Sequence, residues 1–110
     1  MDKQLLKGKV AIITGASYGM GKTIAEVFAE EGASVVMTAR GQEKLDAAVQ
    51  SIKSKGLNAL GVLADASSLE DTKRVFKTAL HEFGDVDILV NNAGIGDMIL
   101  IDETSDEDIA

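Results

Sequence analysis

Cysteine is absent from the 110 residues of this chain, which excludes disulfides, thiolate metal ligands and cysteine catalysis. Long apolar runs are also missing: the longest, such as Val10–Ile13, are about four residues long, whereas a membrane-spanning helix needs roughly 18. The polar N-terminal Met-Asp-Lys-Gln does not resemble a signal peptide. These absences favour a cytoplasmic protein with no membrane partner.

Positive charge is scarce as well, because the formal net charge is -7. Such a chain repels nucleic acid and anionic membranes, so we expect neither as a partner. A positive side chain beside a bound phosphate must then be placed locally. The single histidine, His81, lies in a helical pattern without partner ligands at matching spacing, so we predict a surface histidine and no metal site.

Apolar residues make up 45% of the chain, enough for the core of one domain. Short apolar runs predict strands buried on both faces, as in a parallel sheet. They are Val10–Ile13, Ser34–Met37, Ala59–Leu63 and Ile88–Val90. Helical spacing of apolar residues predicts helices between them. One follows the glycine loop from Ile24 to Glu31, and the other two carry the stripes Leu45, Ala48, Val49, Ile52 and Phe76, Ala79, Leu80, Phe83.

Boundary residues agree with this alternation of strands and helices. Gly32, Gly56 and Gly84 each follow a helical stretch, where a left-handed residue is favoured. Ser68 precedes Leu69-Glu70-Asp71 and is typical of a helix N-cap. The order predicts an α/β fold with right-handed crossovers and an open parallel sheet. The acidic segment 102–110 is expected to be a loop that runs into a further helix.

The glycine-rich stretch Thr14–Thr23 joins the first strand to the first helix and has two interpretations. Glycines at 15, 19 and 21 suit a turn that holds a dinucleotide pyrophosphate. From Ala16, the same stretch nearly matches the phosphate loop of nucleotide triphosphatases, with alanine in place of the first glycine. Both interpretations place an anion at a helix N-terminus. A tight turn without a ligand is a third possibility.

Two distant segments bear on this choice. The apolar run Gly61–Asp65 ends in a carboxylate that could help a triphosphatase to hold magnesium. The second strand ends in Thr38-Ala39-Arg40, about 20 residues after the glycines, where an acid selects NAD and an arginine accommodates the 2′-phosphate of NADP. A guanidinium stands there and no carboxylate does, which favours NADP. The alternative for Arg40 is a solvated loop arginine.

Asn91-Asn92-Ala93-Gly94, directly after the fourth predicted strand, decides between these interpretations. With Thr14–Gly21 and Asp65-Ala66-Ser67, this motif resembles the classical short-chain dehydrogenase/reductase family, over nearly the whole chain from Leu6. The resemblance implies a Rossmann-type doubly wound sheet of about four strands in the order 3-2-1-4. The wording Asp87–Gly94 is similar to the 3-oxoacyl-carrier-protein reductase branch, but it is shared too widely to indicate a substrate.

The resemblance also implies a set of cofactor-binding residues. The glycine motif, with Gly15, Ser17, Tyr18, Gly19, Met20 and Gly21, would bind the pyrophosphate and the adenosine ribose. Arg40 would face the 2′-phosphate, and Asp65 with Ala66 would flank the adenine. Asn92, Ala93 and Gly94 would approach the nicotinamide ribose, while Asn91 would tie the sheet together. Some NADP-using members carry a basic residue where this chain has Tyr18, so NADP is expected, ahead of NAD, on Arg40 and on the missing acid at Ala39.

The family's catalytic serine, its Tyr-x-x-x-Lys pair and an asparagine on its fourth helix have no counterpart here. Tyr18 is the one tyrosine, and its spacing to Lys22 imitates the pair within the phosphate-binding turn. The resemblance therefore implies the cofactor-binding N-terminal half of an oxidoreductase for an alcohol or ketone, with no catalytic residue present. The alternative is a non-catalytic nucleotide-binding fragment, and a triphosphatase is a remote third.

Two expectations follow for assembly. The resemblance implies that the complete enzyme is a homo-oligomer, whose subunits would pair through helices that follow this segment. In a four-stranded sheet of this order, the fourth strand would be an apolar edge with unpaired backbone groups. We therefore expect the isolated chain to self-associate.

Overall fold

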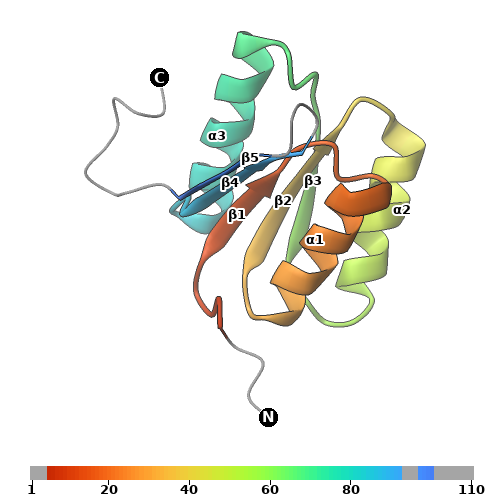
Figure 1. Ribbon diagram of the computed structural model, residues 1–110, viewed down its shortest axis with the longest axis vertical. Coiled ribbons are helices and arrows are strands. Elements are labelled where there is room, and N and C mark those ends of the chain that lie inside the picture. Colours follow the sequence, from red (N-terminus) through yellow and green to blue (C-terminus); the bar gives the residue numbers. More distant parts are fainter. Residues whose placement is uncertain (1–4, 93–96, 101–110) are drawn as a thin grey trace.

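The computed structural model describes residues 5–92 and 97–100 of the chain. Strands and helices alternate up to the fourth strand, and a fifth strand follows (Figure 1). The elements are β1 (Val10–Ile13), α1 (Gly19–Glu30), β2 (Ser34–Ala39), α2 (Gln42–Lys53), β3 (Ala59–Leu63), α3 (Leu69–Phe83), β4 (Ile88–Asn91) and β5 (Asp97–Leu100).

The sheet has the strand order β3-β2-β1-β4-β5. The first four strands are parallel, with Ile12 of β1 between Val36 of β2 and Leu89 of β4. The predicted order 3-2-1-4 and the doubly wound α/β class are confirmed. β2 and β3 are added on one side of β1 and β4 lies on its other side, so the order in which strands are added reverses at β1. This switch point is where such folds bind their ligands.

Helices cover both faces of the sheet, with α1 and α2 on one face and α3 on the other (Figure 1). Because successive strand residues point to opposite faces, Ala11 and Ile13 pack in one core cluster while Ile12 packs in the other. The cluster under α3 includes Val75 and Phe76. Alternation within β1 thus supplies both hydrophobic cores.

β4 is not the edge of the sheet, and that prediction was wrong. β5 pairs with it in antiparallel fashion, Ile88 opposite Leu100 and Asn91 opposite Asp97. An antiparallel strand needs no long crossover, so β5 can pair with the strand that comes shortly before it in the sequence. The apolar run that follows Asp97 is as long as that of β1, yet the sequence analysis did not predict a strand there. The predicted loop and helix at 102–110 lie outside the described residues.

Two further expectations need correction. β3 is the other edge of the sheet, and Leu63 on it is 43% exposed instead of buried on both faces. Leu80 is 48% exposed, and Val75 contributes to the buried stripe of α3 in its place. Among the residues that the structure describes, no helix has the length and apolarity to span a membrane.

The predicted glycines after the helices and the predicted N-cap of α3 are confirmed. Gly32, Gly56 and Gly84 have positive φ angles of 99°, 79° and 82°, and Gly84 caps α3 in the left-handed conformation. The Ser68 hydroxyl oxygen accepts a hydrogen bond from the backbone N–H of Asp71 at 3.2 Å. α1 begins at Gly19, earlier than its apolar pattern suggested, because the glycine loop runs directly into the helix.

Candidate functional site

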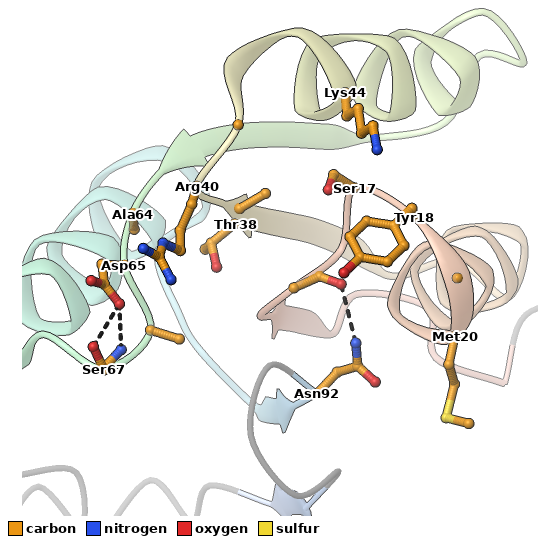
Figure 2. A pocket seen from close by; sticks show the side chains of 15 residues that line it. Ser17, Tyr18, Met20, Thr38, Arg40, Lys44, Ala64, Asp65, Ser67 and Asn92 are labelled. Atoms are coloured by element: carbon orange, nitrogen blue, oxygen red, sulfur yellow. Dashed lines mark hydrogen bonds between the residues drawn. The ribbon is translucent and has the colours of Figure 1, made fainter.

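A cleft of about 550 Å³ lies at the carboxyl ends of β1, β2 and β3 (Figure 2). Its volume is in the usual range for a small-molecule site. Nine of the twelve residues predicted for the cofactor line it: Gly15, Ser17, Tyr18, Gly19, Met20, Arg40, Asp65, Ala66 and Asn92. Ala93 and Gly94 lie outside the described residues. Gly21 does not line the cleft.

The glycine loop presents the N-terminus of α1 to this cleft. Gly15 and Gly19 both have φ near 61°, a conformation that side chains disfavour. Tyr18 is the N-cap, yet no side chain caps the helix there and the first turn holds no acidic residue. The first N–H groups and the positive end of the helix dipole are therefore available to an anion.

Gly21 lies beneath the cleft and lets α1 approach the loop closely. A Cβ at this position would collide with the backbone carbonyl oxygen of Gly15 and lie 2.6 Å from Nδ2 of Asn92. That same Asn92 amide donates a hydrogen bond to the Gly15 carbonyl oxygen at 3.1 Å, drawn in Figure 2. Asn92 therefore ties the end of β4 to the loop, and Gly21 leaves the space for this contact.

Asn91 and Thr14 make a similar connection between the ends of β4 and β1. The Thr14 hydroxyl donates to Oδ1 of Asn91 at 3.2 Å, and the Thr14 backbone N–H donates to the Val90 carbonyl oxygen at 3.0 Å. This geometry agrees with the structural role that the resemblance implied for Asn91. Asn91 and Asn92, at the end of β4, thus connect this strand to the end of β1 and to the glycine loop.

Arg40 follows β2 and is exposed in the cleft, where Figure 2 shows it between Asp65 and Thr38. The Asp65 carboxylate accepts two hydrogen bonds on Oδ1, from the Ser67 hydroxyl at 2.7 Å and the Ser67 backbone N–H at 2.9 Å. These bonds, with a smaller contribution from the positive charge of Arg40, lower the pKa of Asp65 despite some desolvation. Asp65 therefore stays ionised and oriented by Ser67.

Lys44 also lines the cleft, and sequence analysis gave it no role. Its Nζ lies 5.2 Å from the centroid of the Tyr18 ring. The sequence could have indicated this residue, because Lys44 lies in the first turn of the helix after β2. That turn lies at the same edge of the sheet as the glycine loop. Gly41 and Ala64 were overlooked in the same way.

The triphosphatase interpretation is not supported by the positions of its key residues. Neither Lys22 nor Thr23 lines the cleft, and the Thr23 hydroxyl donates to the Gly19 carbonyl oxygen within α1. Within 5–92 and 97–100, no group of three or more potential ligands could hold a metal ion. His81 is a surface residue, as predicted, with its side chain 87% exposed.

A doubly wound parallel sheet with a glycine loop at its switch point defines the class, a Rossmann-type nucleotide-binding domain. The family model described as short chain dehydrogenase matches residues 9–110. The chain therefore belongs to the short-chain dehydrogenase family, which binds nicotinamide dinucleotides and comprises oxidoreductases. The predicted family resemblance is confirmed.

Individual relatives agree with this assignment. An uncharacterized oxidoreductase of Methylorubrum extorquens is 40% identical over 103 residues, which are 93% of this chain and 42% of the relative. A 3-oxoacyl-acyl-carrier-protein reductase of Staphylococcus aureus is 42% identical over 88 residues, 79% of this chain and 36% of the relative. The crystal structure of a hydroxysteroid dehydrogenase from Escherichia coli superposes with a TM-score of 0.79 at 42% identity, over 84% of this chain and 38% of that one. The chain spans about two fifths of the length of these relatives.

Proposed function

We propose that this chain is the NADP(H)-binding N-terminal part of an oxidoreductase that moves a hydride between the cofactor and an alcohol or ketone. The observation that carries the proposal is Arg40, which projects into the cleft from the end of β2. No carboxylate stands beside it at Ala39 to bind a free ribose 2′-hydroxyl. The planar guanidinium can instead grip a 2′-phosphate with two hydrogen bonds.

Other residues of the cleft fit the remaining parts of such a dinucleotide. The uncapped N-terminus of α1 would hold the pyrophosphate, with Ser17 beside it. Asp65 and Ala66, at the end of β3, would flank the adenine. Asn92, on the β4 side, would face the nicotinamide ribose. Bound in this way, the cofactor would supply the hydride.

The substrate class follows from what the relatives share. By their names, one reduces a 3-oxoacyl group and another oxidises a hydroxysteroid, and both are 42% identical to this chain. A ketone or secondary alcohol is common to both. In this proposal the complete protein is cytoplasmic, which the absence of cysteine favours, and it is a homo-oligomer, as the family resemblance implies.

A second candidate is a nucleotide-binding fragment that turns nothing over. It is favoured by the position of Tyr18, the one tyrosine, which is 68% exposed in the glycine loop and belongs to no Tyr-x-x-x-Lys pair on a later helix. The coding sequence after Ala110 separates the candidates. A serine followed in frame by Tyr-x-x-x-Lys would support the enzyme, whereas a stop codon would support the fragment.

Cofactor preference is tested by fluorescence titration of the 110-residue chain with NADPH, NADH and magnesium–ATP. We expect saturable NADPH binding, with NADH at least about tenfold weaker. Arg40→Ala should weaken NADPH about tenfold, or about 1.4 kcal/mol, and leave NADH nearly unchanged. Lys77→Ala, which removes an exposed charge on α3 away from the cleft, is the control. Equal binding of NADPH and NADH, or tighter binding of magnesium–ATP, would contradict the proposal.

A further inference from the structure

We propose that Lys44 is a second cationic determinant of cofactor specificity, held over the ring of Tyr18 so that its ammonium group joins Arg40 around the 2′-phosphate. This inference rests on the proposed NADP(H) binding. It assigns a role to a residue of α2, on the wall of the cleft opposite the glycine loop.

The contact between Lys44 and Tyr18 spans the mouth of the cleft. Lys44 is the third residue of α2, and Tyr18 precedes α1, so the two side chains come from different walls (Figure 2). The separation of 5.2 Å between Nζ and the ring centroid is within the range of a cation–π interaction. Both residues are exposed. The ring therefore restrains a long, flexible lysine without withdrawing its ammonium from solvent or from a ligand.

Charge around Lys44 is not balanced by the protein. Among the side chains that the structure describes, Lys44 and Arg40 form no salt bridge with a carboxylate. Lys44 also lies in the first turn of a helix, where a cation is unfavourable beside the positive end of the dipole. In a chain of net charge -7, Arg40 and Lys44 bring two cations into a cleft whose lining includes one carboxylate, Asp65, near Arg40. This local excess of positive charge suits a polyvalent anion.

The two cations offer different chemistry to the same ligand. Arg40 has a rigid, planar fork at the strand end, which fixes the orientation of a phosphate. Lys44 offers a mobile point charge with three donors, which adds attraction without demanding one geometry. Tyr18 has no charge of its own, so the loop wall gains its positive character through the lysine stacked on it. Both charges would attract a ligand with a 2′-phosphate. A ligand with a free 2′-hydroxyl would lack this attraction and would bind more weakly.

The test compares two ligands that differ in the 2′-phosphate, NADPH and NADH, on four versions of the 110-residue chain. Lys44→Met keeps most of the aliphatic stem and removes the charge, and Lys44→Arg restores a charge. Lys53→Met, at the other end of the same helix and outside the cleft, is the matched control. We expect Lys44→Met to weaken NADPH about three- to fivefold and NADH less than about twofold. Lys44→Arg should stay within about twofold of the wild type for both ligands, and so should Lys53→Met.

Each outcome decides something. If the wild-type chain binds neither ligand, or binds both equally, the proposed function fails and this inference fails with it. If the wild type prefers NADPH but Lys44→Met keeps the same NADPH-to-NADH ratio, the proposed function stands and the role of Lys44 is overturned. An equal loss of both ligands would show that the lysine only packs against Tyr18. Circular dichroism identical to the wild type confirms that each exposed substitution leaves the fold intact.

Discussion

Gly21 shows how a single missing side chain shapes the cleft. Gly21 is the third residue of α1, and at helical positions Gly→Ala normally stabilises by roughly 0.5–1 kcal/mol. Here the new Cβ would collide with the backbone carbonyl of Gly15, which cannot move like a flexible side chain. We expect Gly21→Ala to lower the free energy of unfolding by about 1–3 kcal/mol, as overpacking does. Urea denaturation followed by circular dichroism measures this change.

Gly41→Ala is the matched control for that substitution. A Cβ at Gly41 would meet no atom within 4 Å, and its φ of -105° is accessible to alanine. We expect a change below about 1 kcal/mol, which reflects only the weaker N-cap. A Gly21→Ala chain as stable as the wild type would contradict the close approach of α1 to the loop.

The lining of the cleft could be predicted from the sequence where a residue type answers a backbone or charge requirement by itself, and the cofactor contacts of these residues stay predictions. The glycines of the loop and Arg40 at the strand end are such cases. Lys44 was missed because its contact with Tyr18 joins two segments that are distant in the sequence. The direction of the Lys44 side chain also depends on the residue at which α2 begins. Gly21 does not line the cleft, and its close approach to Gly15 and Asn92 could not be predicted from the motif. A sequence motif predicts which residue type stands at a position. It does not identify the neighbouring atoms that make this residue type necessary.

At the scale of elements, α3 fixes the loop that carries Asp65. The Ser68 hydroxyl accepts from the Asp71 N–H, while the Asp71 carboxylate accepts from the Asp65 N–H at 2.8 Å. The cap and the loop are therefore one connected structure. We expect Ser68→Ala to lower the free energy of unfolding by about 1 kcal/mol, seen as a fall in Tm of roughly 4 °C or more for a domain of this size.

Ser54→Ala is the control, because it removes the same hydroxyl from the C-terminal end of α2. There the hydroxyl donates to the Ser51 carbonyl oxygen on an exposed surface and caps no N–H group. We expect a change within about 0.5 kcal/mol. If both substitutions cost the same, the Ser68 cap contributes nothing particular to α3.

Strands were predicted well where both neighbours exist. β1 and β2 lie inside the sheet, so their continuous apolar runs match their burial. At the edges the same pattern was misleading. β3 keeps an apolar composition although part of it faces solvent, and β5, which pairs with β4, was not predicted at all. Periodicity describes a strand's own sequence, and burial depends on which strands stand beside it.

At the scale of the whole molecule, the excess negative charge and the positive cleft have opposite effects as salt is added. Self-repulsion at a net charge of -7 destabilises the compact state, and screening relieves it. Screening also weakens the attraction of exposed Arg40 and Lys44 for a phosphate, because the Debye length falls from about 8 Å at 0.15 M salt to about 3 Å at 1 M. The apo chain should therefore gain thermal stability with salt while its preference for NADPH declines.

The measurement is a thermal unfolding series with NADPH or NADH at one concentration, in low and high salt. At 100 times its Kd, NADPH should add about 2.7 kcal/mol to the free energy of unfolding. A tenfold weaker NADH should add about 1.4 kcal/mol at that concentration. We expect the Tm gap between the two cofactors to shrink in 1 M salt as the Tm of the apo chain rises. A gap that does not change with salt would mean that contacts other than charge discriminate the 2′-phosphate, and the roles proposed for Arg40 and Lys44 would have to be abandoned.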